Sequence, residues 1–333
     1  MTATSDTPPG LADLEWPPPP YIRPIGGERP IAPRGADHFE GLTYAIVSGY
    51  RQLLLDVHVP HEADAAPVVL WIHGGAWLMG DRRLPPAMWP AGALFQKIVD
   101  AGFAVATMDY RHSLEAPFPA QLHDAKAALR YLRRFASDLR INPDRVVVWG
   151  ESAGGHLAAL VGLTGGQPEW AGQEGVPDGE TTVTAVVDWY GVHDAAHLEL
   201  PGLPIDLATL SPDEAATMAR APLDILVDGS AFGADALRLC SPLSHVRGDA
   251  PPFLLMHGEA DGLVPIAQSE VFADALAAAG AHVDFRRVPG GDHAWLGVDP
   301  LPLIDEALAW IVERVERVER VERVERVERG VPS

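Results

Sequence analysis

One short segment constrains the fold of this chain more than any other: residues 146–156 read Val-Val-Val-Trp-Gly-Glu-Ser-Ala-Gly-Gly-His. The β-branched and aromatic residues before Gly150 predict a buried strand, and the Ala-rich segment that follows predicts a helix. A Gly-x-Ser-x-Gly motif between a strand and a helix lifts the serine side chain above the sheet on a sharp turn. Both flanking glycines are expected because a Cβ there would collide with neighbouring backbone. Ser152 is therefore the candidate nucleophile.

Strands that alternate with helices extend on both sides of this turn. Short apolar runs typical of strands buried on both faces lie at residues 68–73, 103–110, 146–150, 183–190, 253–258 and 282–288. Helical periodicity occupies intervening segments, most clearly residues 119–136 and 265–279. Two period-two segments, residues 42–47 and 52–59, predict an antiparallel pair at the sheet edge. The pattern predicts an α/β protein with a mostly parallel, doubly wound sheet and antiparallel N-terminal strands.

Three regions depart from this alternation: two of them flank the predicted domain of residues 41–311, and the third is an insertion within it. Residues 1–40 are rich in proline and are expected to form an arm over the surface or a flexible leader. Residues 192–240 hold several prolines and a capping box at Ser211, and they predict a small cap over a pocket, with a surface excursion as the alternative. In residues 312–333 the triplet Val-Glu-Arg is repeated six times. This tail is expected to be a charged, solvent-exposed helix without a catalytic role, or else a partner-binding helix.

The composition narrows the range of partners. Acidic side chains outnumber basic ones by 46 to 25, and the net charge of −21 disfavours nucleic acid and anionic membrane surfaces. The single cysteine, Cys240, excludes an intrachain disulfide and a Cys-rich metal site. No apolar stretch reaches the roughly 20 residues of a membrane span, and the first residues lack signal-peptide features. We therefore expect a cytoplasmic protein with a small-molecule partner, and homo-oligomerisation stays open.

A serine nucleophile requires a base and an acid elsewhere in the chain. Where a serine sits on this kind of turn, the usual chain order is serine, acid, histidine. Of the 13 histidines, His293 lies in a glycine-rich loop after the last predicted strand. Asp261 follows the next-to-last strand, with Glu259 as its main rival, whereas Asp292 adjoins the base too closely. Ser152, Asp261 and His293 form the predicted catalytic triad, in which the aspartate fixes the imidazole tautomer.

A glycine-rich loop supplies the predicted oxyanion site. His73-Gly-Gly-Ala76 follows directly after a predicted strand. The backbone N–H groups of Gly75 and Ala76, with that of Ala153 after the nucleophile, would stabilise a developing negative charge. His73 is expected to order this loop by hydrogen bonding and to take no part in proton transfer.

Four further residues lie near these segments in the sequence. Glu151 adjoins the nucleophile, and we favour a structural role over an electrostatic one. Trp77, Trp189 and Trp295 either line an apolar acyl or aryl pocket or pack in the protein interior, and the sequence does not decide between these alternatives.

With these motifs the chain resembles the α/β-hydrolase superfamily, and more narrowly the hormone-sensitive-lipase-like and feruloyl-esterase-like carboxylesterases. The matching segments are His73-Gly-Gly-Ala-Trp77, Asp109-Tyr-Arg111, Gly150-Glu-Ser-Ala-Gly-Gly-His156, Ser241-Pro-Leu-Ser-His-Val246, His257-Gly-Glu-Ala-Asp261 and His293. They span about residues 42–311. Ala76 replaces a third glycine of many relatives, which leaves the required backbone N–H in place.

The resemblance implies the α/β-hydrolase fold and a serine carboxylesterase that hydrolyses small, short-chain acyl or aryl esters through an acyl-enzyme. It implies no metal and no organic cofactor. The alternative is an arylformamidase or other amidase that uses the same triad. A non-catalytic ligand-binding member of the fold is disfavoured, because that interpretation expects a broken triad.

Overall fold

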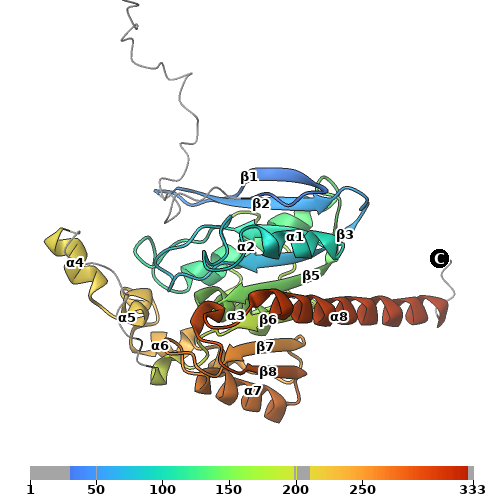
Figure 1. Cartoon of the computed structure of the whole chain (residues 1–333). Coiled ribbons are helices and arrows are strands. Elements are labelled where there is room, and N and C mark those ends of the chain that lie inside the picture. The colour runs from blue at the N-terminus through green and yellow to red at the C-terminus, as the bar shows by residue number, and fades with distance from the viewer. Residues whose placement is uncertain (1–30, 50, 199, 201–210, 329–333) are drawn as a thin grey trace, which may run out of the picture.

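The computed structural model describes residues 31–49, 51–198, 200 and 211–328, and Figure 1 shows their arrangement. The strands are β1 (Ala36–Ile46), β2 (Gln52–Pro60), β3 (Ala66–Ile72), β4 (Ala104–Met108), β5 (Ile141–Glu151), β6 (Ala185–Trp189), β7 (Phe253–Gly258) and β8 (Val283–Val288). The α-helices are α1 (Ala93–Asp100), α2 (Ala120–Arg134), α3 (Ala153–Thr164), α4 (Pro212–Met218), α5 (Pro222–Val227), α6 (Ala236–Cys240), α7 (Ala267–Ala279) and α8 (Pro300–Glu328). Short 3-10 helices are η2 (Pro168–Trp170), η3 (Ala195–His197), η5 (Gly233–Asp235), η6 (Pro242–His245) and η7 (His293–Trp295).

The strands form one eight-stranded sheet in the order β1-β2-β4-β3-β5-β6-β7-β8. β1 pairs antiparallel with β2, and β2 pairs antiparallel with β4. Every other pair is parallel. The predicted α/β architecture with antiparallel N-terminal strands is therefore confirmed. β1 begins at Ala36, inside the segment predicted as an arm, and residues 1–30 of that segment lie outside the described residues.

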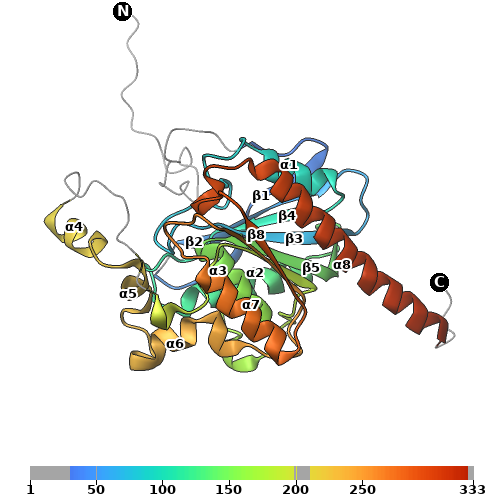
Figure 2. The ribbon, with the colours of Figure 1, turned by 60° about the horizontal axis from the view of Figure 1, so that its bottom comes forward.

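Helices cover both faces of the sheet, as Figure 2 shows. Val68 and Leu70 of β3 point into a core shared with α2, α3 and α7. Their neighbours Val69 and Trp71 point into a second core, shared with α1 and α8. Since both faces are buried, the central strands read as continuous apolar runs with no polar alternation.

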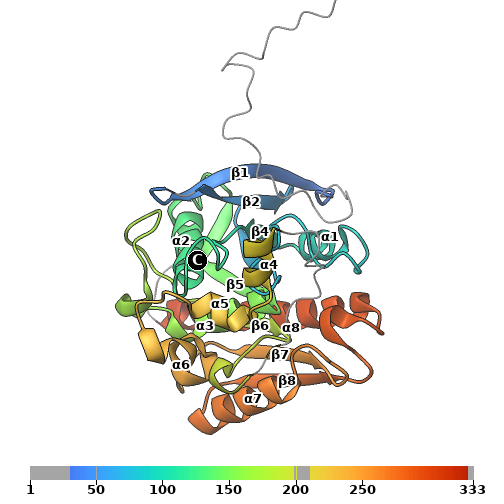
Figure 3. The same cartoon turned by 90° about the vertical axis from the view of Figure 1, so that its left-hand side faces the viewer.

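The insertion between β6 and β7 carries α4, α5 and α6. α4 and α5 face the viewer in Figure 3, and Figure 1 shows them on the side of the molecule opposite the C-terminal end of α8. α4 begins at Pro212, directly after Ser211, the first residue of the predicted capping box. Leu223 and Leu226 of α5 are buried in the core, and the Leu226 carbonyl accepts a hydrogen bond from the Phe118 N–H at 2.8 Å. α5 therefore packs against the domain, whereas α4 stands away from it in Figure 1. Residues 199 and 201–210 of the predicted cap lie outside the described residues.

The C-terminal helix α8 crosses the predicted boundary at residue 312 without a break and extends past the end of the sheet (Figure 1). Val315 is only 4% exposed, and the Arg314 guanidinium lies 2.9 Å from the Asp284 carboxylate of β8. The prediction of a solvent-exposed extension is thus wrong for its first turn, which still lies over the sheet. Farther along, exposed Glu316 and Arg320 form the expected i,i+4 pair at 3.8 Å. Across the residues described, no helix combines the length and the apolar character needed to span a bilayer.

Two truncations test how much of α8 the domain needs. Removal of residues 318–333 leaves Val315 in place and is expected to change the free energy of unfolding by less than about 0.5 kcal/mol. Removal of residues 312–333 exposes the surface that Val315 covers. This truncation is expected to lower the free energy of unfolding by about 1.5–3 kcal/mol. Urea unfolding measures both, and the turnover of folded enzyme should stay unchanged. Equal destabilisation by the two truncations would contradict this account.

Candidate active site

The turn between β5 and α3 holds Ser152 in a backbone conformation that few non-glycine residues adopt, with φ 53° and ψ −120°. A Cβ on Gly150 would overlap the Gly154 carbonyl oxygen, and a Cβ on Gly154 would overlap the Ile72 carbonyl oxygen. The Ser152 N–H donates to the Trp189 carbonyl at 2.8 Å, which anchors the turn to β6. The predicted need for both glycines is confirmed, and the serine side chain stands at the carboxyl edge of the sheet.

A hydrogen-bonded chain joins Ser152 to His293 and Asp261. His293 Nε2 lies 3.0 Å from Ser152 Oγ, and His293 Nδ1 lies 2.8 Å from Asp261 Oδ2. Because a carboxylate can only accept, Nδ1 carries the proton and Nε2 is left to accept from the serine hydroxyl. The three residues follow β5, β7 and β8, whose carboxyl ends meet at one edge of the sheet. The structure thus brings together all three residues of the predicted triad.

Asp261 is held in place and kept ionised by several donors. Its Oδ1 accepts the N–H groups of Leu263 at 2.9 Å and Val264 at 2.8 Å. Burial raises the pKa of the Asp261 carboxyl, but the side chains of His257 and His293 outweigh burial and hold this pKa well below its ordinary value. The carboxylate therefore remains a hydrogen-bond acceptor for His293 throughout the neutral pH range.

The two rival acids lie in other positions. Glu259 is exposed on the surface. The Asp292 carboxylate accepts the N–H groups of Gly262 at 2.9 Å and of His293 at 2.7 Å, so it joins the loops that carry Asp261 and His293. Of these carboxylates, Asp261 alone makes the hydrogen bond to the His293 ring.

The loop after β3 has an unusual backbone conformation at the two residues predicted to supply oxyanion donors. Gly75 has φ 108° and Ala76 has φ 53°, and a Cβ on Gly75 would overlap the Met79 carbonyl oxygen. Among the hydrogen bonds of the described residues, none uses the N–H of Gly75 or Ala76 as donor. Ala153 is the first residue of α3, where a helix leaves its N–H groups without intrahelical acceptors. These three N–H groups remain available to bind an oxyanion.

Glu151 and His73 fix this loop from opposite sides. The Gly74 N–H donates to Glu151 Oε1 at 2.6 Å, and His73 Nδ1 donates to the Gly74 carbonyl at 2.7 Å. The His73 ring stacks on Tyr110 at 4.4 Å. Burial raises the pKa of the Glu151 carboxyl, whereas the charge of His293 and the Gly74 N–H lower it. Both side chains order the loop, as the sequence led us to expect for His73 and Glu151.

The bond from Gly74 to Glu151 can be tested directly. Glu151→Leu removes the acceptor, so the loop should lose its alignment and kcat for an aryl acetate should fall about 100-fold, the order expected when one oxyanion donor is lost. Glu151→Gln keeps an amide oxygen in reach of Gly74 and should stay within about tenfold of the wild-type enzyme. A Glu151→Gln variant as impaired as Glu151→Leu would show that the charge, and not the hydrogen bond, is what matters.

The three tryptophans considered for a substrate pocket lie in the interior instead. Trp77, Trp189 and Trp295 are 1%, 0% and 2% exposed. Trp189 packs edge-on against Trp295 at 5.2 Å, in the core shared with α1 and α8. Side chains this buried offer no surface to a ligand, so the pocket prediction is corrected in favour of core packing.

Trp77 has a specific partner that the sequence did not suggest. Its Nε1–H donates to His156 Nδ1 at 3.1 Å, and His156 Nε2 donates to the Cys240 carbonyl at 2.7 Å. His156 belongs to α3, Trp77 to the loop after β3 and Cys240 to α6, so one imidazole links three elements around the site. Because Nδ1 must accept and Nε2 must donate, the ring is neutral. Burial lowers the pKa of His156 from 6.5 to about 4.

This lowered pKa predicts acid destabilisation. The unfolded chain protonates His156 near pH 6.5, whereas the folded protein does so only near pH 4, so the unfolded state binds more protons between these values. The free energy of unfolding should therefore fall by about 3 kcal/mol through His156 as the pH drops from 6.5 to 4. Urea unfolding at several pH values measures the slope. His156→Gln should lower the slope without abolishing it, because burial also lowers the pKa values of His58 and His112. An unchanged slope would contradict the assignment.

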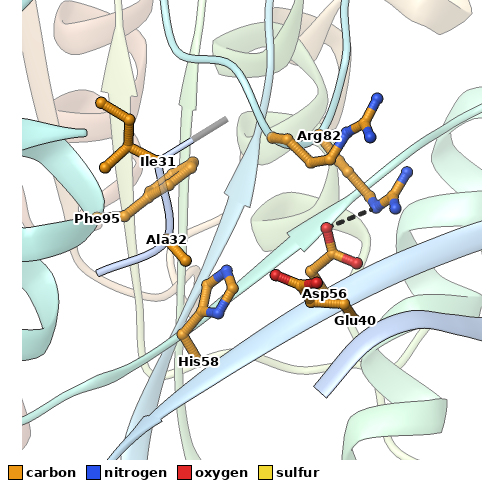
Figure 4. A pocket seen from close by; sticks show the side chains of 8 residues that line it. Ile31, Ala32, Glu40, Asp56, His58, Arg82 and Phe95 are labelled. Atoms are coloured by element: carbon orange, nitrogen blue, oxygen red, sulfur yellow. Dashed lines mark hydrogen bonds and ion pairs between the residues drawn. The ribbon is translucent and has the colours of Figure 1, made fainter. Parts of the chain in front are cut away.

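A separate cavity of about 310 Å³ lies beside the edge strands, as Figure 4 shows. Ile31, Phe95 and His58 line one side, and Arg82 lies opposite them. Arg82 Nε donates to Asp56 at 2.9 Å and its NH1 group donates to Asp109 at 2.9 Å. These buried ion pairs anchor the segment that follows the loop with Gly75 and Ala76. None of the predicted site residues lines this cavity.

Comparison with known proteins identifies the family of this chain and several relatives. A family model described as BD-FAE matches residues 55–276. Esterase LipQ of Mycobacterium tuberculosis is 33% identical over 253 residues, which cover 74% of this chain and 55% of LipQ. The probable carboxylic ester hydrolase LipM of the same organism is 33% identical over 211 residues, which cover 63% of this chain and 45% of LipM. The chain thus spans about half the length of these two relatives.

A solved structure supports the same assignment of fold and family. The truncated form of a carbohydrate esterase from gut microbiota superposes with a TM-score of 0.71 and 28% identity, over 87% of this chain and 100% of that chain. Together with the strand order, this likeness confirms the predicted α/β-hydrolase fold. From its sequence and its architecture, the chain belongs to the BD-FAE family.

Proposed function

We propose that this chain is a serine carboxylesterase that hydrolyses small, short-chain acyl or aryl esters. The observation that carries the proposal is the chain of hydrogen bonds from Ser152 Oγ through the His293 ring to Asp261, at 3.0 and 2.8 Å. The similarity to esterase LipQ and to the probable carboxylic ester hydrolase LipM supports the same reaction class. The preference for short acyl groups is inferred from the resemblance of the sequence to the hormone-sensitive-lipase-like and feruloyl-esterase-like carboxylesterases.

The mechanism is acyl transfer in two halves. His293 Nε2 takes the hydroxyl proton of Ser152 as Oγ attacks the ester carbonyl carbon. The carbonyl oxygen becomes an oxyanion, which accepts hydrogen bonds from the N–H groups of Gly75, Ala76 and Ala153. Each such donor typically lowers the barrier by about 3 kcal/mol. The tetrahedral intermediate then collapses, the bond to the leaving alcohol breaks, and His293 gives its proton to the alcohol oxygen.

In the second half, water replaces the alcohol. His293 takes a proton from water, the hydroxide attacks the acyl-enzyme, and the same three N–H groups hold the second oxyanion. The acid leaves, and His293 returns the proton to Ser152 Oγ. Asp261 keeps the imidazole oriented and stabilises its positive charge in both halves.

A series of p-nitrophenyl esters of increasing chain length tests the proposal. We expect kcat/KM to be highest for acetate to butyrate and to fall for longer chains. A p-nitroanilide and N-formylkynurenine serve as amide comparators and should turn over far more slowly. Acetylated sugars belong in the panel because one structural relative is a carbohydrate esterase. A higher kcat/KM for an amide, or for long acyl chains, would overturn the substrate class proposed here.

A further inference from the structure

A second buried imidazole, His257, lies behind the acid of the triad. It is the fifth residue of β7 and is completely buried. Its Nε2 lies 2.8 Å from the Val264 carbonyl oxygen and 3.3 Å from Asp261 Oδ2. Both neighbours are acceptors, so Nε2 carries a proton. Its Nδ1 lies 2.7 Å from Ser269 Oγ of α7, so a hydrogen bond joins the ring to this hydroxyl.

This imidazole holds Asp261 in two ways. Its N–H contacts Oδ2, the oxygen that also accepts from His293. The same N–H binds the carbonyl of Val264, whose own N–H donates to Asp261 Oδ1 at 2.8 Å. Both carboxylate oxygens are thus linked to His257, one directly and one through a single residue. The hydrogen bond to Ser269 fixes the orientation of the ring.

We propose that His257, fixed by Ser269, is a positioning residue that sets the orientation and the acceptor strength of Asp261 during proton transfer at Ser152. This inference rests on the proposed function. His257 does not touch a substrate bound at Ser152, since Asp261 and His293 lie between them. Its effect reaches the reaction through the hydrogen bond from His293 to Asp261.

The expected electrostatic effect has a definite sign. Without the His257 N–H, the Asp261 carboxylate shares its charge with one donor fewer and attracts the proton on His293 more strongly. The pair of Asp261 and His293 should then bind a proton at higher pH. The acid limb of the pH profile of kcat/KM should therefore move to higher pH. The other titratable groups around the pair are Tyr190 after β6, whose ring lies 4.8 Å from that of His293, together with Glu151 and Asp292. Of these groups Tyr190 also contacts the His257 ring, at 6.4 Å, and His257→Phe keeps an aromatic ring at that position.

Three variants of the full chain test the inference with p-nitrophenyl acetate. His257→Phe keeps a buried ring but removes the donor, and kcat should fall about 10- to 100-fold, the effect expected for one hydrogen bond lost from a buried carboxylate, with KM nearly unchanged. The acid limb should move to higher pH. His257→Gln keeps a side-chain N–H and should recover most of kcat. His245→Phe is the control, because His245 also donates to a carbonyl, that of Leu239 at 2.8 Å, but lies outside the site.

The outcomes separate this inference from the proposed function. If the wild-type protein hydrolyses no ester and a fluorophosphonate does not label Ser152, the proposed function fails and His257 has no reaction to assist. If the wild-type enzyme is active but folded His257→Phe retains its kcat and its acid limb, the positioning role alone is overturned. Should His257→Phe fail to fold, His257→Gln decides: near wild-type kcat supports the donor role, and a large loss in the folded protein contradicts it.

Discussion

Ser152→Ala is expected to lower kcat for p-nitrophenyl acetate by about a millionfold, which is the size of the effect when a serine triad loses its nucleophile. The reason is geometric. Ser152 Oγ is the atom within 3.0 Å of His293 Nε2, and alanine leaves that nitrogen with nothing to deprotonate. Residual catalysis by the oxyanion N–H groups and by binding alone should remain small. Because the triad acts as a unit, adding His293→Ala to Ser152→Ala should cost little more.

The fold should survive this substitution. Alanine adopts the strained backbone of the turn no more readily than serine, so the free energy of unfolding should change by less than about 1 kcal/mol. Urea unfolding and circular dichroism supply that control. A folded Ser152→Ala enzyme with activity within tenfold of the wild type would mean that another residue is the nucleophile.

Asp261→Asn is expected to lower kcat about ten-thousandfold near neutral pH, because an amide can present N–H to His293 Nδ1 and favour the wrong tautomer. In that tautomer His293 Nε2 carries a proton and cannot accept the proton of Ser152. The contacts from Leu263 and Val264 to Oδ1 can persist with an amide oxygen, so the loop should keep its shape. Steady-state kinetics with an aryl acetate measure the loss.

The same loop offers a matched control for this prediction. Glu259 lies two residues before Asp261 and is exposed, so Glu259→Gln removes one negative charge without touching the His293 ring. We expect its kcat to stay within about twofold of the wild-type value. If Glu259→Gln were the more damaging of the two variants, the acid would have been assigned to the wrong carboxylate.

The features that could be predicted from the sequence depend on interactions between residues close together in the chain. The crowding around Gly150 and Gly154 is a property of one turn, so the motif alone predicts a raised serine. Apolar runs buried on both faces leave a readable pattern, and the eight strands of the described residues all overlap predicted segments, although β1 begins at Ala36, before its predicted start at residue 42. His293 and Asp261 could be selected because the carboxyl ends of parallel strands meet at one edge, which restricts useful residues to the loops after the strands.

The remaining features depend on contacts between distant segments. Trp189 could line a pocket or fill the core, and only the packing of Trp295 against it decides for the core. Val315 belongs to a repeat that looks uniform in sequence, but it is buried because α8 still lies over the sheet at that point. His257 is four residues before Asp261, a spacing that could have suggested contact, yet its link to Ser269 of α7 has no signal in the sequence.

Covalent labelling tests the central assignment most directly. The purified protein is treated with a fluorophosphonate, digested and mapped by mass spectrometry, in parallel with Ser152→Ala. We predict one phosphonyl group per chain, located on Ser152, with loss of esterase activity in proportion to labelling and no label on the variant. An active enzyme that remains unlabelled at Ser152, or loses activity through a label on another residue, would contradict the account.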